Sequence, residues 1–329
     1  MESFPGDVRF EEGEWYAVRT TVKIGTRSSA LALRQAEYVA GELEKRYPEI
    51  RTELVHFSTK GDRILEKPLA EIGGKGLFTE ELETAMRSGN IDLAVHSLKD
   101  MPVDLPEGLV IGAVTKREAP YDALVSPKYK TLDKLPQGAK VGTSSLRRQA
   151  QLLHKRPDLN IVVLRGNVQT RLRKLEEEGF DAIVLAQAGL LRLGLGDVIT
   201  QVFAAEDMIP AVGQGALAIE CRDGDADVLR MLEPLADAET THAVTGERSF
   251  LREVQGGCQV PMGIHGTCDR GQLRLRALIS SLDGKRLYEG EMSGPCSKAD
   301  ILGKNLARAL CREGGKDIID NLVKEGIIK

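Results

Sequence analysis

Cysteine is scarce in this chain of 329 residues, and nothing in its spacing resembles a metal site. There are five cysteines, with no C-x-x-C pair and no histidine pair spaced to complete a zinc site. This usage predicts a reducing compartment, a cytoplasmic protein and no metal centre. Long apolar runs are also missing, since no segment approaches the ~18–20 residues of a membrane helix, so we expect no membrane partner. Basic residues are not in excess, because 45 of them face 49 acidic ones, which argues against a nucleic-acid partner.

The first 20 residues lack the apolar run of a secretory signal. They include five acidic residues, whereas transit peptides are poor in acidic residues. We therefore expect residues 1–20 to form a flexible extension, with the fold beginning near Val22.

Apolar patterns from residue 22 onward alternate between buried strands and amphipathic helices. Strands are predicted over 22–25, 52–57, 91–95, 109–114 and 123–126, with helices over 29–47 and 78–87. A second round has strands over 140–142, 161–164 and 182–186, with helices over 146–154, 168–178 and 187–193. We expect the strand over 215–221 to return to the first sheet, because the second is complete without it. This order predicts an α/β fold with two mostly parallel, doubly wound sheets.

The pattern changes after Pro234. A helix over 240–254 leads into a glycine-rich loop, and strands near 273–282 and 286–292 precede a helix that begins at Lys298. These elements predict a small α+β domain at the C-terminus.

Hydroxyl and arginine side chains gather where predicted strands lead into helices, which is where doubly wound folds bind ligands. The segments G-T-R-S-S-A-L-A (25–32) and G-T-S-S-L-R-R-Q (142–149) place helix-capping serines beside arginine. Arg165 ends the next strand in the same way, and Arg171 lies one turn into its helix. Guanidinium groups pair bidentately with carboxylates, so the pattern favours a ligand with several carboxylates. Phosphate is the competing ligand, although no phosphate-loop motif is present. A capped helix beside a solvated arginine is the purely structural alternative.

Arg147 and Arg148 are adjacent on a predicted helix. Consecutive helical residues point about 100° apart, so we expect at most one of the two to face the core. A structural need for both is hard to find, which favours a role in binding an anion.

Asp100 directly follows a buried strand in V-H-S-L-K-D-M-P (95–102), beside Lys99. A carboxylate at the carboxyl end of a strand is well placed for catalysis. The structural alternative is an aspartate that turns the chain before Pro102. His96 has a metal-like spacing to Asp100, but with no third ligand nearby a core histidine is the better interpretation.

Cys258 lies on the polar glycine loop Q-G-G-C-Q-V-P (255–261). Most lone cysteines are small buried hydrophobic residues. This loop makes Cys258 a better nucleophile candidate than the other four cysteines, and both interpretations stay open.

Together these segments resemble the porphobilinogen deaminase family, and the match runs from about Val22 to the C-terminus. Further matching blocks, in family order and spacing, are G-D-R-I-L, I-G-G-K-G-L-F-T-E-E-L, L-R-G-N-V-Q-T-R-L, A-G-L-L-R-L-G and P-A-V-G-Q-G-A-L-A-I-E-C. The resemblance implies two domains folded like type II periplasmic binding proteins and a third α+β domain. The expected limits are 1–20 for the extension, 21–115 with 213–234 for domain 1, 116–212 for domain 2 and 235–329 for domain 3.

The resemblance also implies a transferase of tetrapyrrole (porphyrin and heme) biosynthesis, which joins four porphobilinogen molecules to a dipyrromethane primer and releases hydroxymethylbilane. Cys258 would carry this cofactor through a thioether, and Asp100 would be the catalytic carboxylate. The residues implied to bind the cofactor are Lys99, Thr143, Ser144, Arg147, Arg148, Gln214 and Gly215. The residues implied to bind the substrate are Arg27, Ser29, Arg165, Arg171 and Arg192. We expect a monomer with a small-molecule substrate.

This chain departs from the family pattern at Glu71, where many relatives have lysine, so we assign no role to Glu71 or Lys75. The competing hypothesis is a non-catalytic, two-lobed protein that binds an anionic metabolite. It explains the arginines. It does not explain Cys258 or the third domain, and such proteins usually carry an export signal.

Overall fold

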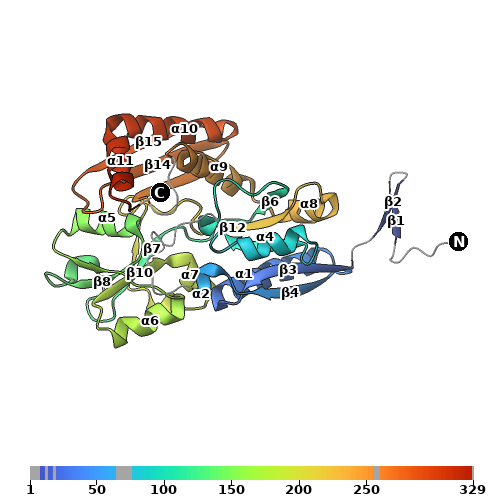
Figure 1. The fold of residues 1–329 in the computed structure, drawn as a ribbon, viewed down its shortest axis with the longest axis horizontal. Helices are drawn as coiled ribbons and strands as arrows, with labels where there is room; N and C mark the ends of the chain where they lie inside the picture. The colour runs from blue at the N-terminus through green and yellow to red at the C-terminus, as the bar shows by residue number, and fades with distance from the viewer. Residues whose placement is uncertain (1–7, 12–13, 18–19, 64–75, 255–259, 328–329) are drawn as a thin grey trace.

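The computed structural model describes residues 8–11, 14–17, 20–63, 76–254 and 260–327. Two five-stranded sheets lie along the long axis of the molecule, and a three-stranded sheet with its helices lies at the top of the view (Figure 1). Within the described residues, every helix is too short or too polar to span a membrane.

The first sheet has the strand order β4 (Arg51–Phe57), β3 (Thr21–Arg27), β5 (Leu93–Ser97), β12 (Leu217–Arg222), β6 (Leu109–Val114). β3 pairs in parallel with β4 and β5, whereas β12 runs antiparallel between β5 and β6. Its helices are α1 (Ala30–Arg46), α2 (Lys60–Arg63), α4 (Glu80–Arg87) and α8 (Ala226–Leu232). α1 and α8 pack on one face of the sheet and α4 packs on the other. The predicted return of a late strand to this sheet is confirmed by β12.

The second sheet has the strand order β11 (Gln201–Phe203), β7 (Asp122–Val125), β10 (Ala182–Ala186), β8 (Lys140–Gly142), β9 (Asn160–Val162). β8, β9 and β10 are parallel, and β7 runs antiparallel to β10 and β11. α5 (Leu146–Lys155) packs on one face, and α6 (Val168–Glu177) and α7 (Gln187–Arg192) pack on the other. Two doubly wound sheets of an α/β protein are therefore confirmed. The chain passes from the first sheet to the second before β7 and returns before β12. Each of these two strands runs antiparallel to its neighbours.

Side-chain caps begin five helices of this fold, α1, α5, α6, α8 and α9 (Ala238–Glu253). The side chains of Ser29, Ser145, Asn167, Asp225 and Asp237 each accept a hydrogen bond from the backbone N–H three residues on. Each bond satisfies one of the free N–H groups of a helix start, which is why these residue types mark the strand-to-helix junctions of the sequence.

The C-terminal unit pairs β13 (Met262–Asp269), β14 (Gln272–Ser280) and β15 (Leu287–Pro295) in an antiparallel sheet. Its helices are α9 (Ala238–Glu253), α10 (Ala299–Leu310) and α11 (Lys316–Lys324). The expected α+β unit is confirmed, but the sequence pattern missed β13. Gly263 and Gly266 interrupt its apolar alternation, because carbonyl oxygens of Ile209 and Ala243 lie 2.7 and 3.1 Å from where their Cβ atoms would be.

Two features were not expected from the sequence. Within residues 1–20, β1 (Val8–Glu11) pairs antiparallel with β2 (Glu14–Ala17), apart from the other sheets (Figure 1). Cys268 at the end of β13 forms a disulfide with Cys296 before α10, and a reducing compartment does not favour such a bond.

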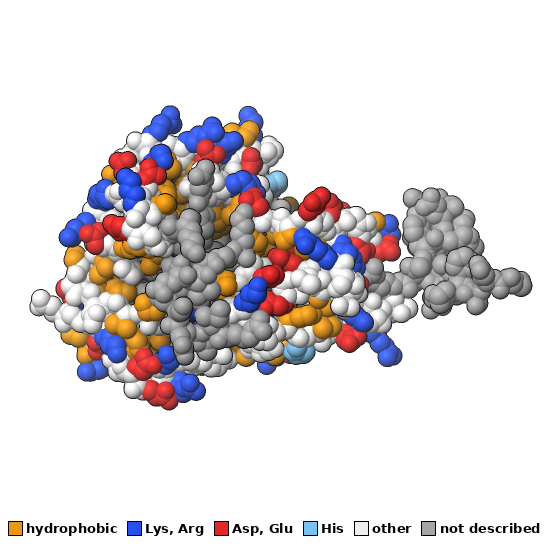
Figure 2. All heavy atoms as spheres, in the orientation of Figure 1, with side chains coloured by type: hydrophobic (Ala, Val, Ile, Leu, Met, Phe, Trp, Pro, Cys, Tyr) orange, Lys and Arg blue, Asp and Glu red, His pale blue; other side chains and the backbone are white. Residues whose placement is uncertain are grey.

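Charges of both signs are interspersed over the face of the molecule seen in Figure 2. The interspersion agrees with the small net charge of −4. No broad positive surface is therefore visible on this face, and the local partners of each arginine determine which anion it can bind.

Candidate active site

Asp100 lies on a short 3-10 turn, η1 (Leu98–Asp100), at the carboxyl end of β5. The Leu98 N–H donates to the Ala216 carbonyl at 3.0 Å, and the Met101 N–H donates to the Leu98 carbonyl at 3.1 Å. The first bond anchors the turn to the residue before β12 of the first sheet, and the second closes the turn itself. Asp100 itself is exposed, so its carboxylate is accessible on an anchored backbone.

Positive charges from the second sheet converge on this turn. Burial lowers the pKa of Lys99, while Asp100 raises it and Arg148 lowers it. Burial also lowers the pKa of Arg171 to about 10, with a further decrease caused by Arg148 and an increase caused by Asp100. Charges perturb one another in this way only at short range. The structure therefore brings together side chains from η1, α5 and α6.

Arg147 and Arg148 are both buried, so the expectation that at most one faces the core is wrong. The reason is Asp122 on β7, which is fully buried and lies 2.6 Å from Arg147 Nη1 and 2.8 Å from Arg148 Nη2. Burial opposes ionisation of Asp122, but the two guanidinium groups outweigh it and hold its pKa well below the usual range. Arg147 also donates to the Ile209 carbonyl at 2.8 Å, and Arg148 to the Val184 carbonyl at 2.9 Å. Both arginines thus have a structural role that the sequence did not reveal.

Gln214 lies on the segment that returns to the first sheet and also contacts Asp122. Its Nε2 donates to the Pro120 carbonyl at 2.6 Å and to Asp122 Oδ1 at 3.1 Å. The side chain is buried, yet no described residue donates to its Oε1. An unsatisfied buried acceptor is costly, and an N–H group of a bound molecule would satisfy it.

Gly215 lies where the chain returns from the second sheet to the first, and the backbone conformation there requires glycine. Its φ is +90°, and a Cβ there would lie 2.3 Å from the Glu118 carbonyl oxygen. The Gly215 carbonyl accepts from Arg192 Nη2 at 2.7 Å and from the Glu118 N–H at 3.0 Å. Arg192 on α7 therefore holds the crossing segment, and burial lowers its pKa.

The starts of α5 and α6 carry the predicted hydroxyl and arginine side chains. Thr143 Oγ1 accepts from the Ser145 N–H at 3.1 Å, and Ser144 Oγ donates to the Leu164 carbonyl. Arg171 Nε donates to the Gly166 carbonyl at 2.8 Å, and burial lowers the pKa of half-buried Arg165. These contacts orient the side chains at the carboxyl ends of β8 and β9.

Arg27 and Ser29 lie at the start of α1, where Arg27 already has protein partners. Its Nε donates to Asp62 at 3.1 Å, and its guanidinium lies 4.2 Å from the centre of the Phe78 ring. Ser29 accepts from the Ala32 N–H at 3.3 Å and so caps the helix. The sequence reasoning missed Asp62, although it lies in the matched block G-D-R-I-L.

His96 belongs to a buried polar cluster beneath β5. Its Nε2 lies 3.1 Å from Glu220 Oε2, and burial raises the pKa of nearby Glu83. The described residues contain no group of three side chains arranged to hold a metal ion. The interpretation of His96 as a core histidine agrees with this position.

Cys258 lies outside the described residues, as do Glu71 and Lys75. The described chain ends before this loop at Val254 and resumes at Val260, and both flanking residues are buried. The thioether at Cys258 therefore stays a prediction from the sequence.

Two family models match the chain. The model described as porphobilinogen deaminase, dipyrromethane cofactor binding domain, matches residues 22–230, and the porphobilinogen deaminase C-terminal domain matches residues 241–312. Proteins named porphobilinogen deaminase from Pelobacter propionicus and Geobacter sulfurreducens are 52% and 51% identical to it. The alignments cover 93% and 91% of this chain, and 98% and 93% of those proteins.

Among solved structures, similarity is found to the aliphatic sulphonate binding protein SsuA of Escherichia coli. The identity is 16% and the TM-score 0.40, covering 72% of this chain and 71% of that one. The BvgS periplasmic VFT2 domain of Bordetella pertussis is 16% identical with a TM-score of 0.38, covering 65% and 86%.

The doubly wound sheets and the matched cofactor-binding domain define a transferase with a dipyrromethane cofactor. The chain belongs to the porphobilinogen deaminase family.

Proposed function

We propose that this chain deaminates four porphobilinogen molecules and joins them stepwise to a dipyrromethane primer on Cys258, releasing hydroxymethylbilane. The observation that carries the proposal is Asp100, an exposed carboxylate on an anchored turn, among cations that suit the substrate's carboxylates. Family membership supports the reaction and the cofactor.

Asp100 stabilises the charge that the reaction develops. Loss of ammonia from porphobilinogen leaves a cation conjugated with the pyrrole nitrogen. A carboxylate ~4 Å away at an effective dielectric constant of 20 stabilises that cation by roughly 4 kcal/mol, about a thousandfold in rate. The carboxylate also accepts a hydrogen bond from the pyrrole N–H. When bound, the dipyrromethane supplies the free α-carbon that attacks the cation.

The arginines hold the acetate and propionate groups. Arg165 and Arg171 are half-buried cations, Arg165 after β9 and Arg171 one turn into α6, and each charge-assisted hydrogen bond contributes roughly 1.5–3 kcal/mol. The residues proposed to bind substrate are Arg27, Ser29, Arg165, Arg171 and Arg192.

The proposed cofactor contacts lie around Asp122. Arg147 and Arg148 together carry one positive charge more than Asp122 neutralises, and Gln214 Oε1 is an acceptor without a described donor. A pyrrole N–H and a carboxylate fit these two features. The residues proposed to bind cofactor are Lys99, Thr143, Ser144, Arg147, Arg148, Gln214 and Gly215.

The proposal includes a monomer with the domain limits expected from the sequence, acting in the cytoplasm. The Cys268–Cys296 disulfide is the observation against a reducing compartment. Alkylation of free thiols in acid-quenched cells, followed by mass spectrometry, tests the location. Alkylated Cys268 and Cys296 would support the cytoplasm, and a pair protected from alkylation by its disulfide would contradict it.

The intact mass of the denatured protein tests the proposed function. We expect a retained increment of two linked pyrroles that Cys258→Ser abolishes. Cys221→Ser and Cys311→Ser, which alter the described free cysteines, are the controls and should keep it. An unmodified wild-type protein that makes hydroxymethylbilane would contradict the cofactor assignment.

A further inference from the structure

The chain that follows Asp100 is held by a helix of the C-terminal unit. The Pro102 and Val103 carbonyls both accept hydrogen bonds from Arg248 Nη2, each at 2.8 Å. Arg248 lies on α9 of the C-terminal unit, and Val244 of the same helix packs against the first sheet. The turn of Asp100 is therefore anchored to the first sheet on its N-terminal side and to α9 on its C-terminal side.

The neighbouring Arg252, one turn further along α9, makes weaker contacts with the same segment. Its Nε lies 3.2 Å from Asp104, with the two side chains 53% and 62% exposed. Its Nη2 lies 3.4 Å from the Val103 carbonyl. Exposed ion pairs contribute little because water screens them and both side chains lose entropy. Arg252 is thus a matched control for Arg248.

The backbone that carries Arg248 is itself fixed. The preceding residue, Glu247, is fully buried and accepts two hydrogen bonds from Arg117, both at 2.8 Å. It also accepts from the Gly213 N–H at 2.7 Å and the Gly266 N–H at 2.8 Å. Breaking such a buried pair is costly, so α9 offers a rigid base for the Arg248 side chain.

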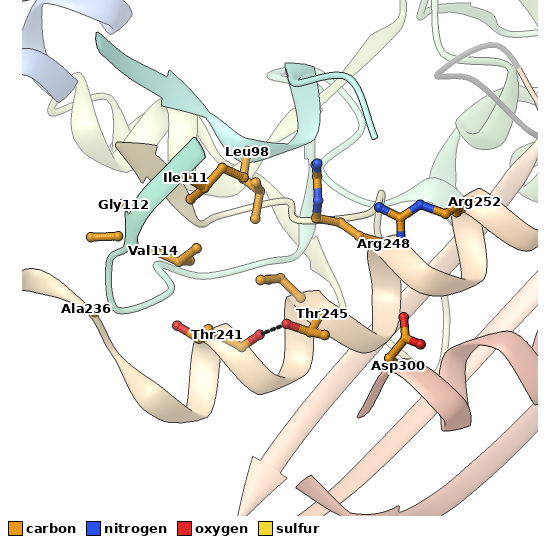
Figure 3. A pocket seen from close by; sticks show the side chains of 12 residues that line it. Leu98, Ile111, Gly112, Val114, Ala236, Thr241, Thr245, Arg248, Arg252 and Asp300 are labelled. Carbon is orange, nitrogen blue, oxygen red and sulfur yellow. Dashed lines mark hydrogen bonds between the residues drawn. The ribbon is translucent and has the colours of Figure 1, made fainter. Parts of the chain in front are cut away.

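The turn also packs against α9, because Leu98, Met101 and Val244 belong to one buried apolar cluster. A cavity of about 300 Å³ lies between β6 and α9, lined among others by Leu98, Val114, Val244 and Arg248. Figure 3 shows Arg248 and Arg252 extending from successive turns of α9 beside this space. Beside this pocket, the two hydrogen bonds from Arg248 add a directional restraint to that packing on the segment after Asp100.

We propose that Arg248 is a positioning residue, which fixes the Asp100 turn so that the carboxylate meets the developing cation. This inference rests on the proposed role of Asp100. A misplacement of about 1 Å in a reacting group can cost a hundredfold in rate. Removing Arg248 leaves two carbonyls without this donor and releases the C-terminal side of the turn.

The first test compares Arg248→Gln with Arg252→Gln in purified, primer-loaded enzyme. For Arg248→Gln we expect kcat to fall roughly ten- to a hundredfold while KM stays within about twofold, because the carboxylate acts in the transition state. For Arg252→Gln we expect kcat within about twofold of wild type. Circular dichroism and Tm verify that each variant is folded. A wild-type kcat in folded Arg248→Gln overturns the proposal.

The second test separates positioning from plain stabilisation by using Asp100→Glu, in which the carboxylate is already displaced. In that background Arg248→Gln should lower kcat by no more than about threefold, a non-additive result expected of coupled groups. Equal losses in both backgrounds would show that Arg248 acts independently of Asp100. If Arg248→Gln does not fold, Arg248→Lys carries the test, with several-fold lower kcat supporting the proposal and wild-type kcat contradicting it.

Failure of this inference is distinguishable from failure of the proposed function. An active wild type, an inactive Asp100→Asn and an unaffected Arg248→Gln overturn the positioning role alone. A wild type that makes no hydroxymethylbilane overturns the function on which the inference rests.

Discussion

Two of the carboxylates that lie near arginines, Asp122 and Asp100, have surroundings that differ in one respect. Asp122 is fully buried between Arg147 and Arg148 and also accepts a hydrogen bond from Gln214. Asp100 is exposed on a turn, with Arg171 near enough to have its pKa altered by it. The same residue types thus form a buried ion pair in one place and leave a carboxylate accessible in the other. Accessibility of the carboxylate, more than the residues beside it, distinguishes the two sites.

The largest effect is expected from removing the charge of the exposed carboxylate. Asp100→Asn should lower kcat about a thousandfold, since roughly 4 kcal/mol of cation stabilisation is lost. The Tm should change by no more than about 2 °C, because exposed substitutions have small effects on stability. Single-turnover kinetics and calorimetry measure the two quantities. A variant that loses Tm as well as activity would assign Asp100 to the fold.

The buried carboxylate should behave in the opposite way. Asp122→Asn leaves two buried guanidinium groups without their anion, which should reduce the free energy of unfolding by about 3–5 kcal/mol. Urea denaturation measures this loss. Asp207→Asn, which breaks an exposed pair with Lys155, is the control and should change little. Equal stability of the two variants would contradict the structural role of Asp122.

Two arginines of α6 allow the same comparison between a proposed ligand-binding residue and an exposed ion pair. Arg171→Leu should raise the KM for porphobilinogen roughly 10- to 150-fold, the equivalent of one charge-assisted hydrogen bond of about 1.5–3 kcal/mol. Arg173, two residues on, pairs with Glu177, and the two side chains are 64% and 60% exposed. Arg173→Leu should therefore leave KM unchanged. Similar KM values for both variants would refute the assignment of Arg171.

The smallest expected effect is a dependence of stability on pH. The pKa of Asp122 is lower in the folded protein than its ordinary value, so its contribution is complete above pH ~4 and is lost as the pH falls. The free energy of unfolding should decline less steeply below pH ~4 in Asp122→Asn than in wild type. Chemical denaturation at several pH values measures the slopes. Identical slopes would show that Asp122 gains nothing from its arginines.

The sequence predicted the elements whose apolar pattern is local. The strands and helices of both large sheets follow from such patterns, as does the return of β12, because each element buries one face against its neighbours. β13 was missed because glycines interrupt its apolar pattern. The glycines are needed where carbonyl groups of distant segments, including Ile209, lie too close for a side chain. The Cys268–Cys296 disulfide also joins elements whose proximity no local pattern indicates.

The candidate site shows the same limit. Asp100 was found because it directly follows a buried strand, a position that sequence order reveals. Asp122 and Asp62 were missed because their partners Arg147 and Arg27 lie 25 and 35 residues away in sequence. The expectation that at most one of the adjacent arginines faces the core failed for that reason, since a single buried carboxylate pairs with both side chains from a direction that helix geometry alone does not show.

The most direct test of the central claim ranks two substitutions at Asp100 by kcat. If the carboxylate stabilises a cation, Asp100→Glu keeps the charge about one bond length away and should retain a measurable fraction of activity, whereas Asp100→Asn should retain almost none. If Asp100 only turns the chain before Pro102, asparagine should replace it well and glutamate poorly. An Asp100→Asn enzyme as active as wild type, beside a damaged Asp100→Glu enzyme, would contradict the catalytic role.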